Sequence, residues 1–142
     1  MINIIVIPTL ALGLWREARG EGFDGMRAVA HVFRNRVRAG WHDGDWYTNL
    51  ISKNELSSMT VLCDPQTICW PSTEDELFKH AYRIAYKVIN DDDPEDITKG
   101  AVFYRNPKTA TSVWFQRNVV ESGKYFKSAA IGNHVFWAPV KE

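Results

Sequence analysis

The stretch TLALGLWREARGEGFDGMRAVAHVFRNRVRAG, residues 9–40, decides the fold. Apolar side chains recur three and four positions apart on both sides of a glycine-rich interruption at 20–25, which predicts two consecutive amphipathic helices. We expect Thr9 to cap the first helix and Gly20 to end it, because glycine tolerates the left-handed turn found at helix ends. The acidic side chain of Glu17 then falls in the last turn of that helix.

The second predicted helix and a third one later in the chain have similar apolar faces. Asp24 is the expected cap of the second helix, which ends near Gly40. Thr73 and Glu76 form a capping box for the third helix, which ends at Asn90. The expected core positions of these two helices are Met26, Val29, Ala30, Phe33, Val37, Leu77, Ala81, Ile84, Ala85 and Val88.

The segments outside these helices are less regular. Residues 1–8, MINIIVIP, predict a buried N-terminal strand or extended arm. A cleaved signal peptide is the alternative, although no Lys or Arg precedes the apolar run. Residues 41–71 have weak periodicity and many turn formers, so we expect loops and short helical turns there. No run of roughly 20 apolar residues predicts a membrane span.

The last third of the sequence has a β-type pattern. Strand-like runs occur at 101–104, 112–115 and 135–137, and Gly132-Asn133 predicts a tight hairpin turn. With helices first and a small antiparallel sheet in the C-terminal part, we expect one α+β domain over residues 1–142.

The composition excludes several classes of function. Lys plus Arg equals Asp plus Glu at 17 each, so the chain lacks the positive field that non-specific nucleic-acid binding needs. No phosphate-binding glycine loop or metal-spaced ligand cluster is present, so no cofactor or metal is expected. The acidic run 91–96 lacks EF-hand spacing and predicts a solvated loop in preference to a calcium site. Cys63 and Cys69 are expected to be free thiols, with a short-loop disulfide as the alternative in an exported protein.

Four polar arrangements could carry chemistry. They are Glu17 with Glu21, Asn35 with Arg36, Tyr104-Arg105-Asn106 at a strand end, and IGNHVF at 131–136 around His134. A carboxyl group beside aromatic surface is disfavoured in its ionised form by desolvation, which makes Glu17 a candidate proton donor. Each arrangement also has a structural explanation, such as a surface glutamate between two arginines. None of them identifies a function by itself.

Six short stretches follow one another in the order seen in a known family. They are EARGE at 17–21, Gly25, AVAHV at 28–32, NRV at 35–37, GAVFYRN at 100–106 and IGNHVF at 131–136. Together they resemble the spore cortex-lytic cell-wall hydrolases of the SleB/CwlJ type. The resemblance implies a peptidoglycan glycosidase with a lysozyme-like catalytic domain, in which Glu17 is the acid. Glu55-Leu56 stands where that family usually has Gln-Phe, so the resemblance does not extend to the floor of the cleft.

The substrate implied by this resemblance is the β-1,4 bond between N-acetylmuramic acid and N-acetylglucosamine. The resemblance favours a lytic transglycosylase, in which the 6-hydroxyl of the sugar attacks and leaves a 1,6-anhydro end. Simple hydrolysis by a muramidase would need a second carboxylate, and the spacing selects none of Asp24, Asp43, Asp45, Glu55 and Asp64. Strand ends and hairpin turns near the acid would supply the sugar contacts, for which we expect Tyr104, Trp114 and Asn133.

Two other functions are compatible with the sequence. A catalytically silent peptidoglycan-binding module would keep the fold and its many aromatic side chains, whose flat faces suit sugar rings as well as cores. A peptidoglycan amidase or peptidase would ordinarily need zinc ligands. A catalytic domain acting as a monomer suits a phage endolysin, cytoplasmic until a holin releases it to the cell wall, or alternatively a spore-associated lysin.

Overall fold

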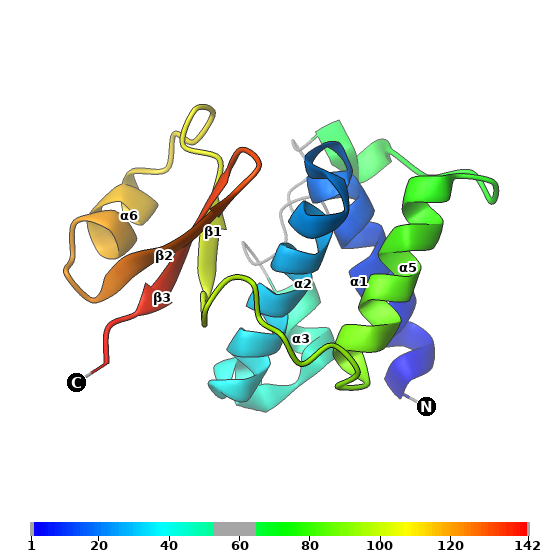
Figure 1. Cartoon of the computed structure of the whole chain (residues 1–142), viewed down its shortest axis with the longest axis horizontal. Helices are drawn as coiled ribbons and strands as arrows, with labels where there is room; N and C mark the ends of the chain where they lie inside the picture. Colours follow the sequence, from blue (N-terminus) through cyan, green and yellow to red (C-terminus); the bar gives the residue numbers. More distant parts are fainter. Residues whose placement is uncertain (1, 53–64, 142) are drawn as a thin grey trace.

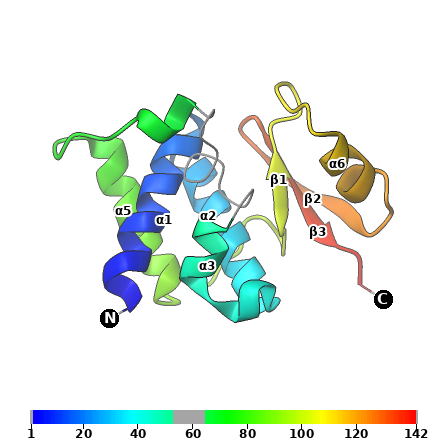
Figure 2. The same cartoon turned by 180° about the vertical axis from the view of Figure 1, so that it is seen from behind.

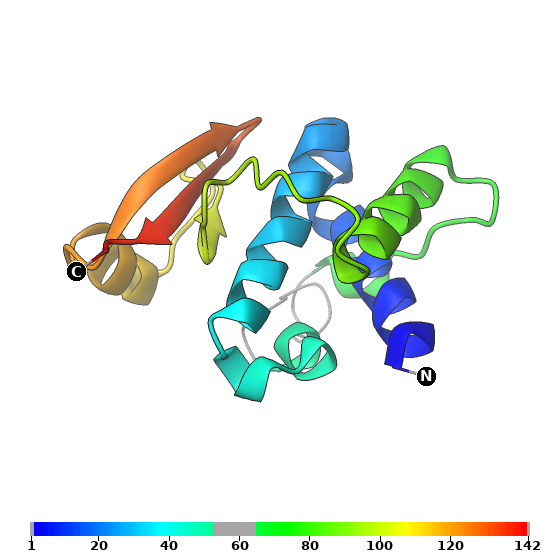
Figure 3. The same ribbon diagram turned by 60° about the horizontal axis from the view of Figure 1, so that its bottom comes forward.

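The computed structural model describes residues 2–52 and 65–141. Four helices gather on one side of the molecule (Figures 1 and 2): α1 (Ile2–Ala18), α2 (Gly22–Arg38), α3 (Trp46–Ile51) and α5 (Glu76–Ile89). A small sheet and α6 (Val113–Phe115) lie on the other side. The chain that leaves α5 crosses α2 before it enters the sheet (Figure 3). The predicted α+β class, with helices first and a small antiparallel sheet in the C-terminal part, is confirmed.

The helix α1 extends further toward the N-terminus than the sequence predicts. It begins at Ile2 and includes Pro8, so the prediction of a strand or extended arm is wrong. Proline inside a helix costs about 3 kcal/mol, but each large apolar side chain that becomes buried contributes about 1.5–3 kcal/mol. The hydroxyl of Thr9 donates to the Ile5 carbonyl at 2.7 Å, as a residue inside the helix and not as its cap. The buried side chains of this helix include Val6, Ile7, Leu10 and Leu14.

Within the described residues, no helix combines the length and apolar character needed to cross a membrane.

The helix α2 starts earlier than predicted and ends where expected. Its first residue is Gly22, so Asp24 lies in the first turn, where a carboxylate suits the positive end of the helix dipole, and is not the cap. The helix ends at Arg38, and Gly40 closes the following turn with a left-handed φ of 85°. The predicted core positions Met26, Val29, Ala30 and Phe33 are buried, and Val37 is half-buried.

The helix α5 has a different cap from the predicted one. The carboxylate of Asp75 accepts a hydrogen bond of 3.0 Å from the backbone N–H of Phe78, so the helix begins at Glu76 and the Thr73 capping box is wrong. Its end at Asn90 is as predicted. Leu77 is 41% exposed and does not belong to the core. The other predicted core positions, Ala81, Ile84, Ala85 and Val88, are buried.

Short turns connect α2 with α5 wherever the chain is described. The 3₁₀ turns η2 (Trp41–Gly44) and η3 (Pro65–Ile68), together with α3, agree with the predicted loops and short helical turns. Cys69, just after η3, has a free, half-buried thiol, as predicted. Cys63 lies outside the described residues, as do Glu55-Leu56 and Asp64.

The sheet consists of three antiparallel strands in the order β1-β3-β2. Their bounds are Phe103–Arg105 for β1, Tyr125–Ile131 for β2 and His134–Pro139 for β3. Ile131 pairs with His134 around the turn Gly132-Asn133, which confirms the predicted hairpin.

The predicted strand at 112–115 is wrong. The Ser112 hydroxyl accepts a hydrogen bond of 3.1 Å from the backbone N–H of Phe115 and starts α6, which continues into a π-helical turn over Gln116–Val120. The strand preference of Val, Trp and Phe reflects packing on a pleated surface more than the backbone itself, so a local cap can override it.

Two apolar clusters lie on different faces of α2. The larger one joins α2 to α1, α3 and α5. The smaller one lies between α2 and the sheet and contains Ala28, Val32, Ala101 and Phe136. Tyr104 packs against both clusters and therefore marks the junction between the helices and the sheet.

Candidate active site

The end of α1 brings Glu17 next to the sheet. Glu17 is half-buried in the last turn of the helix, as predicted. The hydroxyl of Tyr104, on β1, donates a hydrogen bond of 2.9 Å to Glu17 Oε1 across 87 positions of sequence. The structure thus brings together the predicted acid and one of its predicted substrate-binding residues.

The ring of Tyr104 is held on both of its sides. It stacks on Phe136 with 5.9 Å between ring centroids and makes an edge contact with His134 at 5.3 Å. Burial and then the nearby Glu17 carboxylate raise the pKa of Tyr104 well above its ordinary value, so the hydroxyl stays protonated at neutral pH. Tyr104 is therefore a fixed donor that orients one oxygen of Glu17.

The second carboxylate of the motif is bound to the hairpin turn. Glu21 accepts hydrogen bonds from the backbone N–H of Asn133 at 2.7 Å and from its Nδ2 at 3.2 Å. The backbone hydrogen bond from Asn133 lowers the pKa of Glu21. Two glycines make room for Glu21, because a Cβ at Gly25 would collide with the Cβ of Glu21 and a Cβ at Gly132 would collide with its carboxylate. We call this contact the hairpin clamp; it joins the predicted sugar contact Asn133 to the start of α2.

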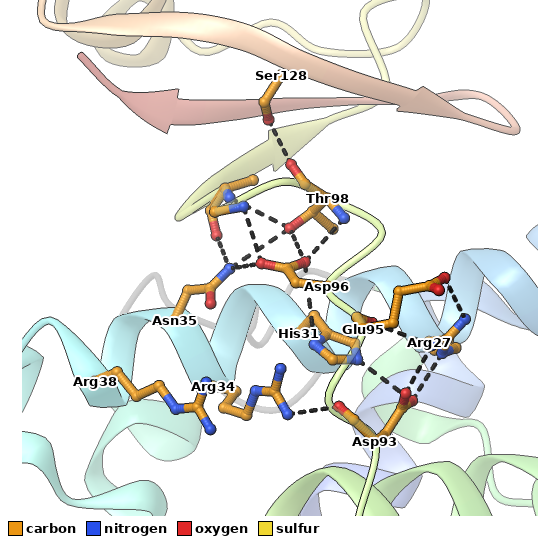
Figure 4. Close-up of polar contacts among 12 residues, drawn as sticks. Arg27, His31, Arg34, Asn35, Arg38, Asp93, Glu95, Asp96, Thr98 and Ser128 are labelled. Carbon is orange, nitrogen blue, oxygen red and sulfur yellow. Dashed lines mark hydrogen bonds and ion pairs between the residues drawn. The ribbon is translucent and has the colours of Figure 1, made fainter. Parts of the chain in front are cut away.

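A hydrogen-bond network fixes the chain that enters β1 (Figure 4). The Asp96 carboxylate accepts from the backbone N–H and hydroxyl of Thr98, at 2.9 and 2.6 Å, and from Asn35 Nδ2 at 2.8 Å. Asn35 Nδ2 also donates to the Ala101 carbonyl at 2.9 Å, and the Ser128 hydroxyl donates to the Thr98 carbonyl at 2.7 Å. Asn35, a candidate from the sequence, therefore connects α2 to the sheet.

The acidic run 91–96 is not wholly a solvated loop, and the prediction is wrong for Asp93 and Asp96. Asp93 forms a bidentate pair with Arg27 at 2.6 and 2.7 Å and lies 3.3 Å from His31 Nε2 (Figure 4). Burial lowers the pKa of His31, so its imidazole is neutral at pH 7. Among residues 2–52 and 65–141, no group of three or more His, Cys, Asp or Glu side chains could hold a metal ion.

An aromatic surface runs from η2 across β1 to α6. The ring centroid of Phe103 lies 5.3 Å from that of Trp41 and 6.0 Å from that of Trp114. The buried guanidinium of Arg36 lies against Trp41 at 4.9 Å and donates to the Val102 carbonyl, so this candidate also has a structural role. Trp114 is 59% exposed. It lies on the Phe103 side of β1, whereas Tyr104 faces the other way because successive strand residues alternate.

An open hollow of about 320 Å³ adjoins this aromatic surface. Its polar lining consists of Arg105, Thr111, Ser112, Gln116, Arg117 and Glu121. Arg105 donates to Gln116 Oε1 at 2.8 Å, and Gln116 Nε2 donates to Glu121 at 2.8 Å. The Tyr104-Arg105-Asn106 motif thus contributes both to the contact with Glu17 and, through Arg105, to this hollow.

The candidates for a second carboxylate have different positions. Asp45 caps α3, because its carboxylate accepts from the backbone N–H and hydroxyl of Thr48 at 2.8 and 2.6 Å. Asp24 and Asp43 are exposed. Glu55 and Asp64 lie outside the described residues.

Sequence reasoning missed the role of the arginines around Glu17. Arg16 Nε donates to the Cys69 carbonyl at 2.9 Å, and Arg19 NH1 donates to Gln66 Oε1 at 2.9 Å. Both side chains therefore bind the turn at η3 instead of lying free on the surface. The tryptophans Trp15 and Trp70 were the signal in the sequence for these contacts, because arginine stacks readily on indole rings.

Comparison with known proteins identifies the family. The model of the family described as Cell Wall Hydrolase matches residues 20–137. The chain belongs to the cell wall hydrolase family. Tyr104, Trp114, Asn133 and Glu21 lie within the matched range of this cell wall hydrolase, and Glu17 lies just before it.

Relatives of this cell wall hydrolase agree with the resemblance seen in its motifs. The spore cortex-lytic enzyme of Halalkalibacterium halodurans is 33% identical over 121 residues, covering 84% of this chain and 33% of the relative. That of Oceanobacillus iheyensis is 31% identical over 121 residues, covering 84% of this chain and 40% of the relative. The chain thus spans less than half the length of these curated relatives.

Two solved structures resemble this cell wall hydrolase along most of its length. The catalytic domain of the germination-specific lytic transglycosylase SleB from Bacillus anthracis matches with a TM-score of 0.64 and 26% identity, covering 92% of both chains. The catalytic domain of the Bacillus cereus SleB protein matches with a TM-score of 0.63 and 26% identity, covering 92% of this chain and 88% of the other. The predicted family resemblance and fold class are confirmed.

Proposed function

We propose that this cell wall hydrolase cleaves the β-1,4 bond between N-acetylmuramic acid and N-acetylglucosamine in peptidoglycan, with Glu17 as the general acid. The observation that carries this proposal is the hydrogen bond of 2.9 Å from the Tyr104 hydroxyl to Glu17 Oε1. It orients a half-buried carboxyl group at the point where the helices meet the sheet. The family and the similar catalytic domains support the substrate class.

The reaction that we propose needs one carboxyl group. Protonated Glu17 gives its proton to the bridging oxygen while the bond between that oxygen and C1 of the muramic acid breaks. The 6-hydroxyl of the same sugar attacks C1 and closes a 1,6-anhydro ring. The Glu17 carboxylate accepts the proton of that hydroxyl, so the acid is restored and no water is consumed. The attacking hydroxyl is tethered to the reacting carbon, which gives it a large effective concentration.

Three residues serve the substrate in this proposal. Tyr104 orients Glu17 through its hydroxyl. Trp114 offers an exposed ring to a sugar, beside the polar hollow at α6. Asn133 offers the hairpin tip, where its backbone N–H is already bound to Glu21.

Replacement of Glu17 by Gln tests the proposed acid. The substitution keeps the size of the side chain and removes the transferable proton, so lysis of purified walls should fall by at least about a hundredfold while thermal unfolding is unchanged. Glu74→Gln is a matched control, because Glu74 is a solvent-exposed carboxylate. If Glu17→Gln clears a wall suspension as fast as the parent protein, Glu17 is not the acid.

Three alternatives predict other results. A non-catalytic peptidoglycan-binding module would leave wall turbidity unchanged. A muramidase would lyse walls and leave reducing ends, with a second carboxylate such as Glu55 assisting water. An amidase or peptidase would lose activity on treatment with a metal chelator, whereas the proposed glycosidase keeps it.

We further propose that the chain acts as a monomer on glycan strands, with no nucleic-acid or membrane partner. The setting that the sequence favours is a phage endolysin, cytoplasmic until its release to the wall. The curated relatives are named spore cortex-lytic enzymes, which supports the alternative, spore-associated setting.

A further inference from the structure

Trp70 is an exposed indole close to the end of α1. The side chain is 71% exposed and follows η3 by two residues. Leaving so much apolar surface in water forgoes the stabilisation that burial would give. Among the described residues, neither apolar cluster includes it.

Arg16 fixes the position of Trp70 from one side. Its guanidinium carbon lies 4.6 Å from the centre of the Trp70 ring. The same guanidinium donates to the carbonyls of Cys69 at 2.9 Å and Thr67 at 3.2 Å. Arg16 is itself buried. One face of the indole is therefore held by a cation–π contact on an anchored turn, while most of the ring surface stays open to solvent.

The anchor of Trp70 adjoins the proposed acid. Arg16 directly precedes Glu17, so their Cα atoms are about 3.8 Å apart. On the other side of Glu17, Arg19 stacks on Trp15 at 4.0 Å and donates to Gln66 Oε1 at 2.9 Å. Both arginines thus bind the segment 65–70 to the helix end that carries Glu17, so the indole is held at the same end of α1 as the acid.

We propose that Trp70 is a sugar-binding subsite, on which an N-acetylated pyranose ring of the glycan strand stacks. The carbon-bound hydrogens of a pyranose ring form an apolar face that matches the face of an indole. The occupant is a glycan rather than a protein, because the exposed large apolar side chains of the described segment 65–70 are those of Trp70 and Ile68, far less than a stable protein interface buries. The inference rests on the proposed function. A glycan strand that is cut at Glu17 continues on both sides of the cleaved bond and therefore passes over the protein surface around the acid.

Binding of chitohexaose, a neutral hexamer of N-acetylglucosamine, tests the subsite by isothermal titration calorimetry. All variants carry Glu17→Gln, so that the ligand is not cut. Trp70→Ala should raise Kd about tenfold, as expected when a central aromatic contact is truncated, and Trp70→Phe should restore most of the affinity. Tyr86→Ala, which removes an exposed aromatic ring from α5, should bind like its parent.

A kinetic measurement separates a binding role from a structural one. With Glu17 present, Trp70→Ala should raise KM for glycan strands freed of peptides and leave kcat nearly unchanged, because stacking holds substrate and transition state alike. The melting curve should match that of the parent, since the side chain is exposed. An unchanged Kd for Trp70→Ala and for Trp70→Phe, or a lowered kcat at constant KM, would overturn the subsite. A fully active Glu17→Gln variant would instead overturn the acid, and the effect of Trp70→Ala on KM, measured with Glu17 present, would still test the subsite.

Discussion

Replacing Glu21 by Gln should weaken the hairpin clamp and leave the chemistry in place. The Glu21 carboxylate accepts two hydrogen bonds from Asn133, at 2.7 Å from its backbone N–H and at 3.2 Å from its Nδ2. Glutamine has the same length but offers one oxygen and one NH₂ group. One of the two donors of Asn133 would therefore face another donor, and the negative charge that strengthens both bonds would be lost.

The structure sets the size of this effect. A hydrogen bond to a charged group contributes about 1.5–3 kcal/mol to stability, and the lower end applies because Glu21 is partly exposed to solvent. We expect the free energy of unfolding to fall by about 1.5 kcal/mol. For a chain of this size, that loss lowers the melting temperature by roughly 3–6 °C.

Thermal unfolding followed by circular dichroism measures the stability of Glu21→Gln, and turbidity loss of purified walls at room temperature measures its activity. The variant should melt earlier than its parent and retain most of its lytic rate, and the control Glu74→Gln should differ from its parent in neither property. An unchanged melting temperature together with a loss of activity of about a hundredfold would refute the reasoning. Glu21 would then be a catalytic partner of Glu17.

Three further results are expected. Tyr104→Phe keeps the stacked ring but removes the hydroxyl that orients Glu17, so kcat/KM on walls should fall about tenfold to a hundredfold at an unchanged melting temperature. A value of kcat/KM equal to that of the parent would contradict this role. Asp96→Asn disturbs the network that joins α2 to the sheet and should lower the free energy of unfolding by about 2 kcal/mol in urea, whereas an unchanged urea midpoint would show that the network contributes little. Acidification should destabilise the fold in two steps. Burial lowers the pKa of His31, so the neutral imidazole stabilises the protein above the unfolded pKa of about 6.5 and this contribution is lost as the pH falls through the lower folded value. Hydrogen bonding to its arginine partner lowers the pKa of Asp93, which adds a further loss below about pH 4. Urea midpoints that stay constant between about pH 7 and pH 4 would contradict the first step, and midpoints that do not fall further below about pH 4 would contradict the second.

Elements with local signals could be predicted from the sequence. The apolar period of α2 places Met26 and Phe33 in the core, and both are buried. The turn Gly132-Asn133 depends on the chemistry of two adjacent residues, and the hairpin forms there. Periodicity and turn chemistry involve only neighbouring positions, so the sequence is enough to reveal them.

Elements decided by tertiary contacts or by competing caps could not be predicted in the same way. Pro8 indicated the end of a strand or arm, but burial of the surrounding apolar residues keeps α1 helical. The run 112–115 has strand-forming residues, yet the cap at Ser112 makes it helical. Thr73 and Asp75 compete for the start of α5, and the structure uses Asp75.

The candidate site was predictable in part. The order of the motifs pointed to Glu17 and Tyr104, but their contact spans 87 positions and no local pattern signals it. The same limit applies to Asp96, which the acidic run presented as one more solvated carboxylate. Arg16 also looked like a surface charge until its contact with Trp70 was visible.

Mass spectrometry of digested peptidoglycan tests the central claim most directly. If Glu17 acts as the acid and the 6-hydroxyl of the muramic acid attacks, the parent protein should release muropeptides that end in 1,6-anhydro-N-acetylmuramic acid. These products are lighter by one water than the products of lysozyme on the same walls, and they should be missing from a parallel digest with Glu17→Gln. A parent digest that contains only reducing ends would contradict the proposed reaction and direct the search for a second carboxylate to Glu55 first.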